Sequence, residues 1–181
     1  MRFIETKLKG AYLVEIEKLE DDRGFFGRAW CCDEFSEMGL NSDIKQINTS
    51  FSHQKGTLRG LHYQIDPHQE AKFIRCTQGR IFDVIVDLRP DSPTFLQWDG
   101  YELGAEDGRM MYVPEHFATG FITLEDNCGM YYPTTQVYVP GAERGIRYDD
   151  PVFGIEWPIE ARVVSEKDRS RADFDIQNFN R

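Results

Sequence analysis

Short runs of β-branched and aromatic residues, each bounded by Gly, Pro, Asp or Asn, recur along most of this chain and constrain its fold more than any other feature. The runs are roughly 5 to 8 residues long, which is typical of strands in a sandwich or barrel. We therefore predict an all-β fold, and the succession of candidate strands suggests a closed or nearly closed barrel.

The clearest strand pattern runs from Lys72 to Leu88. Two apolar runs, Phe73–Cys76 and Ile81–Leu88, flank the turn-like segment Thr77–Arg80, and this pattern predicts a β-hairpin. Further strands are expected at Met111–Val113, Thr119–Leu124, Met130–Tyr132 and Val137–Val139.

Helices are expected to be few and short. One is predicted around Asp33–Met38, with Gly39 placed to terminate it, and a second near the carboxyl end. Neither is long enough to build a parallel α/β sheet.

Length and charge limit the organisation and the partners. No repeat, low-complexity tract or linker divides the 181 residues, so we expect a single domain over residues 1–181. The 21 Lys and Arg residues against 31 Asp and Glu residues give a net charge of −10, which repels phosphate backbones and anionic membranes. We therefore predict neither a nucleic-acid nor a membrane partner, whereas a small anionic ligand remains compatible with a few converging arginines.

The cysteines and the amino terminus indicate a reducing compartment. Cys31 and Cys32 are adjacent, and no Cys-x-x-Cys spacing links them to Cys76 or Cys128, so we expect reduced thiols. The charged segment Met1–Lys7 lacks the apolar core of a signal peptide, and no apolar run approaches the length of a membrane span. A cytoplasmic location is predicted.

Several common chemistries lack their motifs. The chain has no Gly-x-Gly-x-x-Gly, no P-loop and no Gly-x-Ser-x-Gly. The histidines are not spaced so that one strand or helix would direct two of them at one ion, so no metal site is predicted, although distant histidines can still meet in space. They are His53, His62, His68 and His116.

The segment Leu58–Gln64 carries the main chemical candidate, His62. Strand alternation would place Arg59 and His62 on opposite faces unless a bulge intervenes, and Gly60 makes such a bulge plausible. Without further context, a core histidine beside a surface arginine would be the simpler interpretation.

Five ordered sequence blocks supply that context. Together they resemble the dTDP-4-dehydrorhamnose 3,5-epimerase family over nearly the whole chain, from about Ile4 to Asp168. The blocks are Asp22–Phe26, Leu58–Gln64, Phe82–Arg89, Glu143–Pro151 and Ser165–Asp168.

The resemblance implies a cupin-type (jelly-roll) β-barrel with a few short helices, which usually forms a homodimer. It also implies an epimerase of a nucleotide-diphospho-4-keto-6-deoxy sugar that needs no cofactor and serves deoxysugar biosynthesis, such as that of dTDP-rhamnose. The chemistry agrees, because a ketone acidifies the hydrogens on the carbons beside it. A base, an oxyanion stabiliser and an acid on the opposite face therefore suffice to invert carbon 3, carbon 5 or both.

Four residues match the family's catalytic positions. His62 matches the base, and the ordinary pKa of a histidine lies near working pH. Asp168 matches its partner carboxylate, and Lys72 the lysine that stabilises the enolate. Tyr132 matches the proton donor, although the adjacent Tyr131 means that one of the two tyrosines is expected merely to pack. Outside the resemblance, Asp168 would be interpreted as a surface charge and Lys72 as a strand-edge lysine.

A second set matches positions that bind the nucleotide or sugar. In the family, Arg23 and Phe26 reach the site from the neighbouring subunit, and Phe26 and Tyr138 enclose the base. The remaining matches are Gln46, Asn48, Arg59, Glu143 and Lys167.

Two positions depart from the family pattern. Gly27-Arg28 replaces an acidic residue that helps to recognise thymine, and Thr119 replaces a substrate-contacting histidine. His116 lies three residues before Thr119 and would face the other way on a strand, so we expect it to have a surface or packing role. We hypothesise that the reaction is retained with a different nucleotide or a differently substituted sugar. The alternatives are a related cupin acting as a 3-epimerase or ketoisomerase, or a non-catalytic sugar-nucleotide binding protein.

Overall fold

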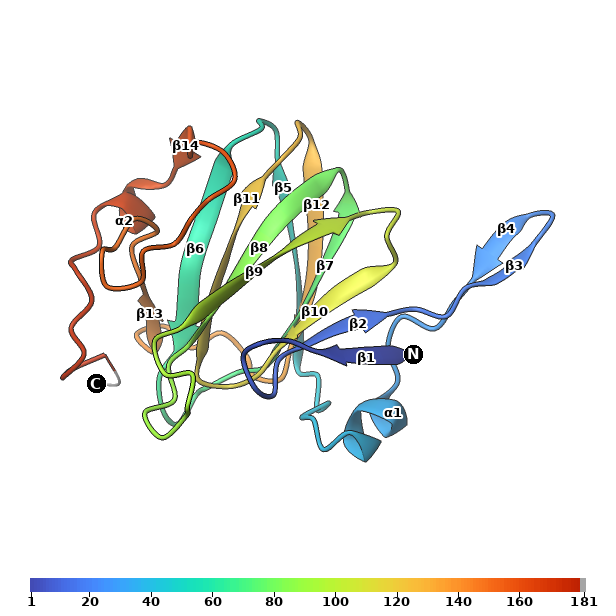
Figure 1. Ribbon diagram of the computed structural model, residues 1–181, viewed down its shortest axis with the longest axis horizontal. Helices are drawn as coiled ribbons and strands as arrows, with labels where there is room; N and C mark the ends of the chain where they lie inside the picture. The colour runs from blue at the N-terminus through green and yellow to red at the C-terminus, as the bar shows by residue number, and fades with distance from the viewer. Residues whose placement is uncertain (180–181) are drawn as a thin grey trace.

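Two β-sheets packed face to face form most of the computed structural model, which describes residues 1–179 (Figure 1). In the first sheet the order is β1 (Arg2–Glu5), β2 (Tyr12–Glu15), β10 (Arg109–Val113), β7 (Lys72–Gln78), β12 (Cys128–Thr134) and β5 (Gln46–Ser52). In the second it is β13 (Glu143–Gly145), β6 (Thr57–Gln64), β11 (Phe117–Thr123), β8 (Arg80–Asp87) and β9 (Trp98–Gly104), with β14 (Val163–Val164) beside β6.

The strands pair in the manner of a jelly roll. Every strand pair within residues 1–179 is antiparallel except β14 with β6. From β5 to β8, and again from β10 to β12, consecutive strands alternate between the two sheets. This topology confirms the predicted all-β, cupin-type barrel.

The hairpin predicted between Lys72 and Leu88 is wrong, although both of its strands exist. β7 pairs with β10 and β12, whereas β8 pairs with β11 and β9, so the chain crosses between the sheets at Gly79. Gly79 has φ +72°, and a Cβ there would lie 2.7 Å from the Sγ atom of Cys128. An apolar alternation shows which side chains are buried, but it does not show which strand lies alongside.

The second incorrect prediction is a strand at Val137–Val139, a segment that forms an irregular loop. The other predicted strands are found in β10, β11 and β12, except that β11 ends at Thr123, one residue before the predicted end. Side chains of neighbouring strands, and not a partner strand, hold this loop in place. Gln46 and Gln64 accept hydrogen bonds from the backbone of Tyr138 and Val139.

Burial explains why β8 is almost continuously apolar. Its residues Ile81 and Ile85 belong to the core between the two sheets, whereas Val84 and Val86 pack outward against the carboxyl-terminal segment. A strand covered on both faces has no solvent side on which polar residues would alternate. Asp83 is therefore conspicuous in this strand, because its side chain is completely buried.

Two short helices lie outside the sheets. Helix α1 (Cys32–Glu37) buries Phe35 against Phe73 and Tyr112 and is followed by Gly39 at φ +72°, as the sequence predicts. Helix α2 (Glu166–Arg169) begins after Ser165, whose side chain accepts a hydrogen bond from the backbone of Asp168. In the described part of the chain, no helix has the length and apolar character needed to cross a membrane.

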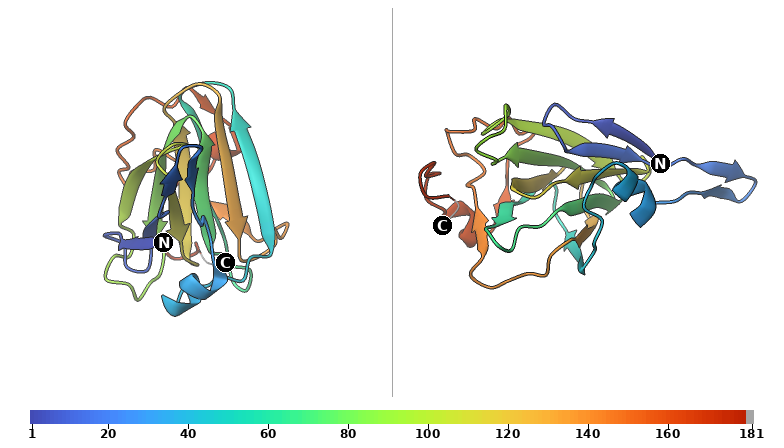
Figure 2. Two further views of the ribbon diagram at one scale, coloured as in Figure 1. Left: turned by 90° about the vertical axis from the view of Figure 1, so that its right-hand side faces the viewer. Right: turned by 90° about the horizontal axis from the view of Figure 1, so that it is seen from below.

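The hairpin of β3 (Leu19–Asp21) and β4 (Gly24–Phe26) projects away from both sheets (Figure 1), and the view from below shows the same separation (Figure 2). Its large apolar side chains are exposed: Leu19 to 68%, Phe25 to 52% and Phe26 to 73%. A two-stranded hairpin is only marginally stable in water by itself, so this element needs a surface to pack against.

Candidate active site

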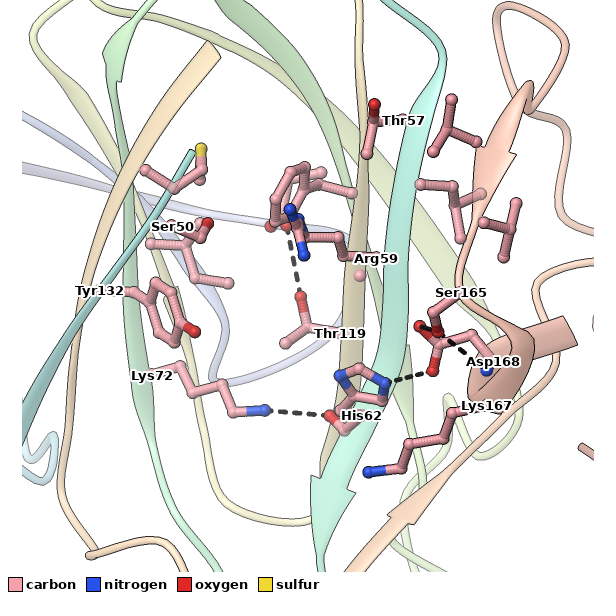
Figure 3. A pocket seen from close by; sticks show the side chains of 18 residues that line it. Ser50, Thr57, Arg59, His62, Lys72, Thr119, Tyr132, Ser165, Lys167 and Asp168 are labelled. Carbon is pink, nitrogen blue, oxygen red and sulfur yellow. Dashed lines mark hydrogen bonds and ion pairs between the residues drawn. The ribbon is translucent and has the colours of Figure 1, made fainter. Parts of the chain in front are cut away.

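A cavity of about 480 Å³ opens between the two sheets (Figure 3). Apolar side chains of the inner core, including Ile74, Phe121 and Met130, form part of its wall. Seven of the predicted site residues line it, namely Arg59, His62, Lys72, Thr119, Tyr132, Lys167 and Asp168.

An adjoining cavity of about 350 Å³ shares His62, Lys72 and Tyr132 with the first. It holds four more of the predicted binding residues, Gln46, Asn48, Tyr138 and Glu143. The two cavities together form one elongated site, which suits a ligand with a sugar at one end and a further group at the other.

A bulge in β6 brings Arg59 and His62 to the same cavity. Phe121 pairs with Arg59 and Thr119 pairs with His62, so two steps along β11 match three along β6. Gly60 occupies the bulge at φ +114°, and a Cβ there would lie 2.6 Å from the Cα atom of Gly120. The bulge expected at Gly60 is confirmed.

His62 and Asp168 form a hydrogen-bonded pair. Nε2 of His62 lies 2.6 Å from Oδ1 of Asp168, whose other oxygen accepts a 2.9 Å hydrogen bond from Ser165. Burial would raise the pKa of Asp168, but the hydrogen bond and charge of His62, with the Ser165 bond, lower it to about 2. An ionised carboxylate only accepts, so Nε2 carries a proton, and in the neutral form of the imidazole Nδ1 has the lone pair.

Lys72 is anchored beside this pair. Its ammonium donates a 3.0 Å hydrogen bond to the carbonyl oxygen of His62 and lies 3.2 Å from Oε1 of Glu70. The Lys72 and Glu70 side chains are only 11% and 12% exposed. A cation that is held in place and shielded from solvent is suited to stabilise a developing oxyanion.

Tyr132 lies across the cavity from His62 (Figure 3). Burial raises the pKa of the Tyr132 phenol, the Arg59 cation opposes this shift, and the Glu70 carboxylate adds to it. The phenol therefore keeps its proton at neutral pH. Tyr131 is 42% exposed and points outward, so strand alternation directs Tyr132 and not Tyr131 into the cavity.

Charged residues flank the opening. Arg59 donates hydrogen bonds to Oγ of Ser52 at 3.2 Å and to the carbonyl oxygen of Phe51 at 3.1 Å. Burial would raise the pKa of Glu143, but its hydrogen bond from Lys167 and the neighbouring positive charges lower it. The Arg59 and Lys167 side chains can bind a diphosphate through charge-assisted hydrogen bonds.

Three predicted residues do not reach the cavities of their own chain. Arg23 forms an ion pair with Asp21 in the projecting hairpin, and Phe26, the last residue of β4, is exposed. Arg28 donates a 2.6 Å hydrogen bond to Glu34. His116 also lies outside the cavities, in the turn before β11.

The sequence prediction missed three residues of this site. Ser165 supports Asp168, Glu70 pairs with Lys72, and Asp83 lines the larger cavity. Asp83 carried a signal, because a carboxylate within the apolar run Ile81–Val86 is either paired or functional. Glu70 and Ser165 lie in turn-like segments, where polar residues are ordinary.

Comparisons with known proteins show which sequences and structures this chain is similar to. Residues 5–175 match the sequence profile of the dTDP-4-dehydrorhamnose 3,5-epimerase family. A relative from Methanothermobacter thermautotrophicus, named dTDP-4-dehydrorhamnose 3,5-epimerase, is 44% identical over 93% of this chain and 92% of its own length.

Two solved structures extend the comparison. The crystal structure of dTDP-4-dehydrorhamnose 3,5-epimerase from Elizabethkingia anophelis is 37% identical and covers 99% of both chains, with a TM-score of 0.95. ChmJ, a 3'-monoepimerase from Streptomyces bikiniensis solved in complex with dTDP-quinovose, is 30% identical, with a TM-score of 0.86 over 93% of this chain and 86% of its own.

Proposed function

This chain belongs to the dTDP-4-dehydrorhamnose 3,5-epimerase family and is an epimerase of a nucleotide-linked 4-keto-6-deoxy sugar, and we propose that His62, Lys72 and Tyr132 carry out the inversion. One observation carries this assignment of roles: the His62–Asp168 pair faces Tyr132 across one cavity, with Lys72 anchored beside His62.

The proposed reaction moves one proton off a carbon and another onto its opposite face. Nδ1 of His62 takes the proton from a carbon beside the ketone, and the electron pair of the broken C–H bond delocalises onto the ketone oxygen. Tyr132 then donates its phenolic proton to the other face of the same carbon, and the ketone re-forms. Solvent restores the proton to Tyr132 and removes it from His62, so the net change is an inverted centre.

Lys72 has the electrostatic role in this scheme. The enolate carries a negative charge that the ketone lacks, so the ammonium binds the intermediate more tightly than the substrate. A single well-placed donor of this kind changes kcat by about 100- to 1000-fold. Asp168 holds the imidazole tautomer and stabilises the imidazolium that forms.

Exchange with solvent deuterium tests these roles. In D2O, the protein should incorporate deuterium at a carbon beside the ketone of dTDP-4-keto-6-deoxyglucose. His62→Asn should abolish this exchange while still binding the nucleotide sugar, and His53→Asn, at an exposed histidine outside the cavity, should exchange normally. A parent protein that binds without exchanging would be a binding protein, and one that moves the keto group would be a ketoisomerase.

The nucleotide and the inverted centre are the finer parts of the proposal. The family name and the dTDP-quinovose bound to ChmJ support a dTDP-linked sugar. Arg28 and Thr119 motivate the contrary hypothesis of a different nucleotide or sugar substituent. A panel of dTDP-, CDP-, GDP- and UDP-linked 4-keto sugars separates them, because turnover of the dTDP compound alone contradicts the hypothesis of a changed nucleotide. Locating the deuterium by NMR identifies the inverted carbon.

We also propose that the protein acts as a homodimer. The projecting hairpin exposes Phe25 and Phe26, and the outward face of β5 and β12 exposes Ile47, Phe51 and Tyr131. Apolar side chains gathered on two surfaces are typical of an interface. A second copy would cover them and would bring Arg23, Phe26 and Arg28 to a cavity that they do not reach in their own chain.

Subunit complementation tests the dimer. Arg23→Ala and His62→Asn, inactive as separate proteins, should regain roughly a quarter of the parental activity when mixed and refolded, because statistical mixing gives half heterodimers, each with one intact site. No recovery, together with a monomeric mass by light scattering, would contradict the proposal.

We propose a cytoplasmic location from the state of the cysteines and the net charge. All four cysteines are free thiols in this fold, and the net charge is −10. Cell fractionation with an antibody against the protein would test it, and recovery from an extracellular fraction would contradict it.

A further inference from the structure

Asp83 is a carboxyl group in the cavity wall to which no role has yet been given. It lies on β8, and its partner across to β11 is Phe121, while Thr119 of β11 is the partner of His62. His62, Thr119 and Asp83 therefore lie on three adjacent strands, and all three line the same cavity.

The two oxygens of Asp83 have different surroundings. Oδ1 accepts a 3.3 Å hydrogen bond from the hydroxyl of Thr119. Oδ2 is buried and has no hydrogen-bond partner among residues 1–179. Oγ of Ser50, which lines the same cavity, is likewise buried without a partner in this part of the chain. Buried polar atoms in native proteins are nearly always bonded, so atoms of this kind in a cavity wall indicate a ligand.

A negative charge on Asp83 would have no ion-pair partner in the described residues. Its side chain is 0% exposed, and no cation forms an ion pair with it in the described residues, Lys72 acting only at longer range. Burial raises the pKa of the Asp83 carboxyl well above its ordinary range, and the Thr119 bond and the Lys72 charge oppose this only in part. Burial therefore favours the protonated form of this carboxyl, which has one O–H donor and further acceptor capacity.

We propose that Asp83 and Thr119 form a sugar-binding pair, in which the free oxygen of Asp83 and the Thr119 hydroxyl bind a hydroxyl group of the sugar beside His62. The terminal torsion of an aspartate is broad, so a small rotation of the carboxyl can bring Oδ2 toward a group bound against this wall while Thr119 stays within hydrogen-bonding reach of Oδ1. A sugar hydroxyl both donates and accepts, so it can pair with the Asp83 carboxyl in either protonation state and with the threonine hydroxyl beside it. This inference rests on the proposed function, because it places the sugar ring in the larger cavity.

A structural role and a binding role predict opposite behaviour for Asp83→Leu, which has a similar shape without polar atoms. Replacing this carboxyl by an apolar group removes the cost of burying it, and the Thr119 hydroxyl that loses its acceptor lines the cavity, where water can bond it, so the fold should not lose stability. For a sugar-binding residue, kcat/KM for dTDP-4-keto-6-deoxyglucose should fall by about 10- to 100-fold while the melting temperature is unchanged or raised. Asp83→Asn keeps a donor and an acceptor and should stay within about threefold of the parent.

Thr119→Val removes the second hydroxyl without changing the shape and should lower kcat/KM by about tenfold. The matched control is Thr123→Val on the same strand. Thr123 is completely buried, donates a 2.8 Å hydrogen bond to the carbonyl oxygen of Gln54 and does not line the cavity. Its replacement should lower the stability and leave kcat/KM unchanged.

A substrate series identifies the bound group. Analogues that lack the 2-hydroxyl or the 3-hydroxyl are compared as ligands by thermal shift in the parent and in Asp83→Leu. The parent and Asp83→Leu should bind with equal affinity the analogue that lacks the hydroxyl group contacted by Asp83.

The inference is overturned if Asp83→Leu retains the parental kcat/KM, or loses no more than Thr123→Val does. If Asp83→Leu does not fold, Asp83→Val and Thr119→Val decide on the same criterion. A parent protein without deuterium exchange would reject the proposed function itself, whereas normal exchange with insensitive variants would reject only the sugar-binding pair.

Discussion

Nε2 of His62 lies 2.6 Å from Oδ1 of Asp168, although 106 residues separate the two in the chain. β6 supplies the imidazole, and the short helix α2 after β14 supplies the carboxylate. β14 pairs with β6, so the sheet itself brings the two side chains together.

Asp168→Asn should lower kcat by about 100- to 10,000-fold, because an amide can donate to Nε2 and stabilise the wrong imidazole tautomer. Ser165→Ala keeps the carboxylate and removes one of its donors, so it should cost less than Asp168→Asn. Steady-state kinetics on the epimerisation would measure both. Equal activity of Asp168→Asn and the parent would contradict the assignment of His62 as the base.

The same carboxylate should make stability depend on pH in acid. Its pKa is lowered to about 2 in the folded protein from 3.8, so its contribution of about 2 kcal/mol is complete above about pH 4 and is lost as the pH falls toward 2. Urea unfolding of the parent and of Asp168→Asn across this range should show a steeper loss in the parent. Parallel curves would mean that Asp168 titrates normally.

Tyr132→Phe should remove reprotonation while leaving proton abstraction intact. Deuterium exchange on the His62 face should persist, and formation of the inverted product should fall by about 100-fold or more. Tyr131→Phe is the matched control, since Tyr131 faces outward on the same strand. Product NMR separates the two measurements, and a similar effect of both substitutions would contradict the role of Tyr132.

Lys72→Met should damage activity and stability for separate reasons. Loss of the ammonium should lower kcat by about 100- to 1000-fold, and the unpaired Glu70 should lower the free energy of unfolding by about 1 to 3 kcal/mol. The double variant Lys72→Met/Glu70→Gln should regain much of the stability and none of the activity. Urea unfolding and kinetics on the three proteins test this, and recovery of activity in the double variant would contradict it.

Gly60→Ala should destabilise the barrel by more than 2 kcal/mol, because the residue has φ +114° and its Cβ would lie 2.6 Å from the backbone of Gly120. Gly39→Ala measures the cost of the positive φ alone, since Gly39 has φ +72° with open space around it. Thermal unfolding should show a clearly larger loss at Gly60, and equal losses would mean that the close approach is readily relieved.

The faces of the strands and much of the site's composition could be predicted from the amino-acid sequence. Alternation put Tyr131 and Tyr132 on opposite faces and the family resemblance selected Tyr132, while the glycine in Leu58–Gln64 indicated the bulge that brings Arg59 and His62 together. These properties depend on neighbouring residues along one strand, where a period of two decides which side a Cβ faces.

The strand partners and the surroundings of each polar group depend instead on how the two sheets pack. β7 and β8 look like a hairpin in sequence yet belong to different sheets, because packing of the two layers chooses the partners. The same packing buries Asp83 with one oxygen unbonded and places Glu70 against Lys72. Burial and partners are properties of residues distant in the chain, so no local pattern records them; it is these contacts that determine the charge of each group in the site.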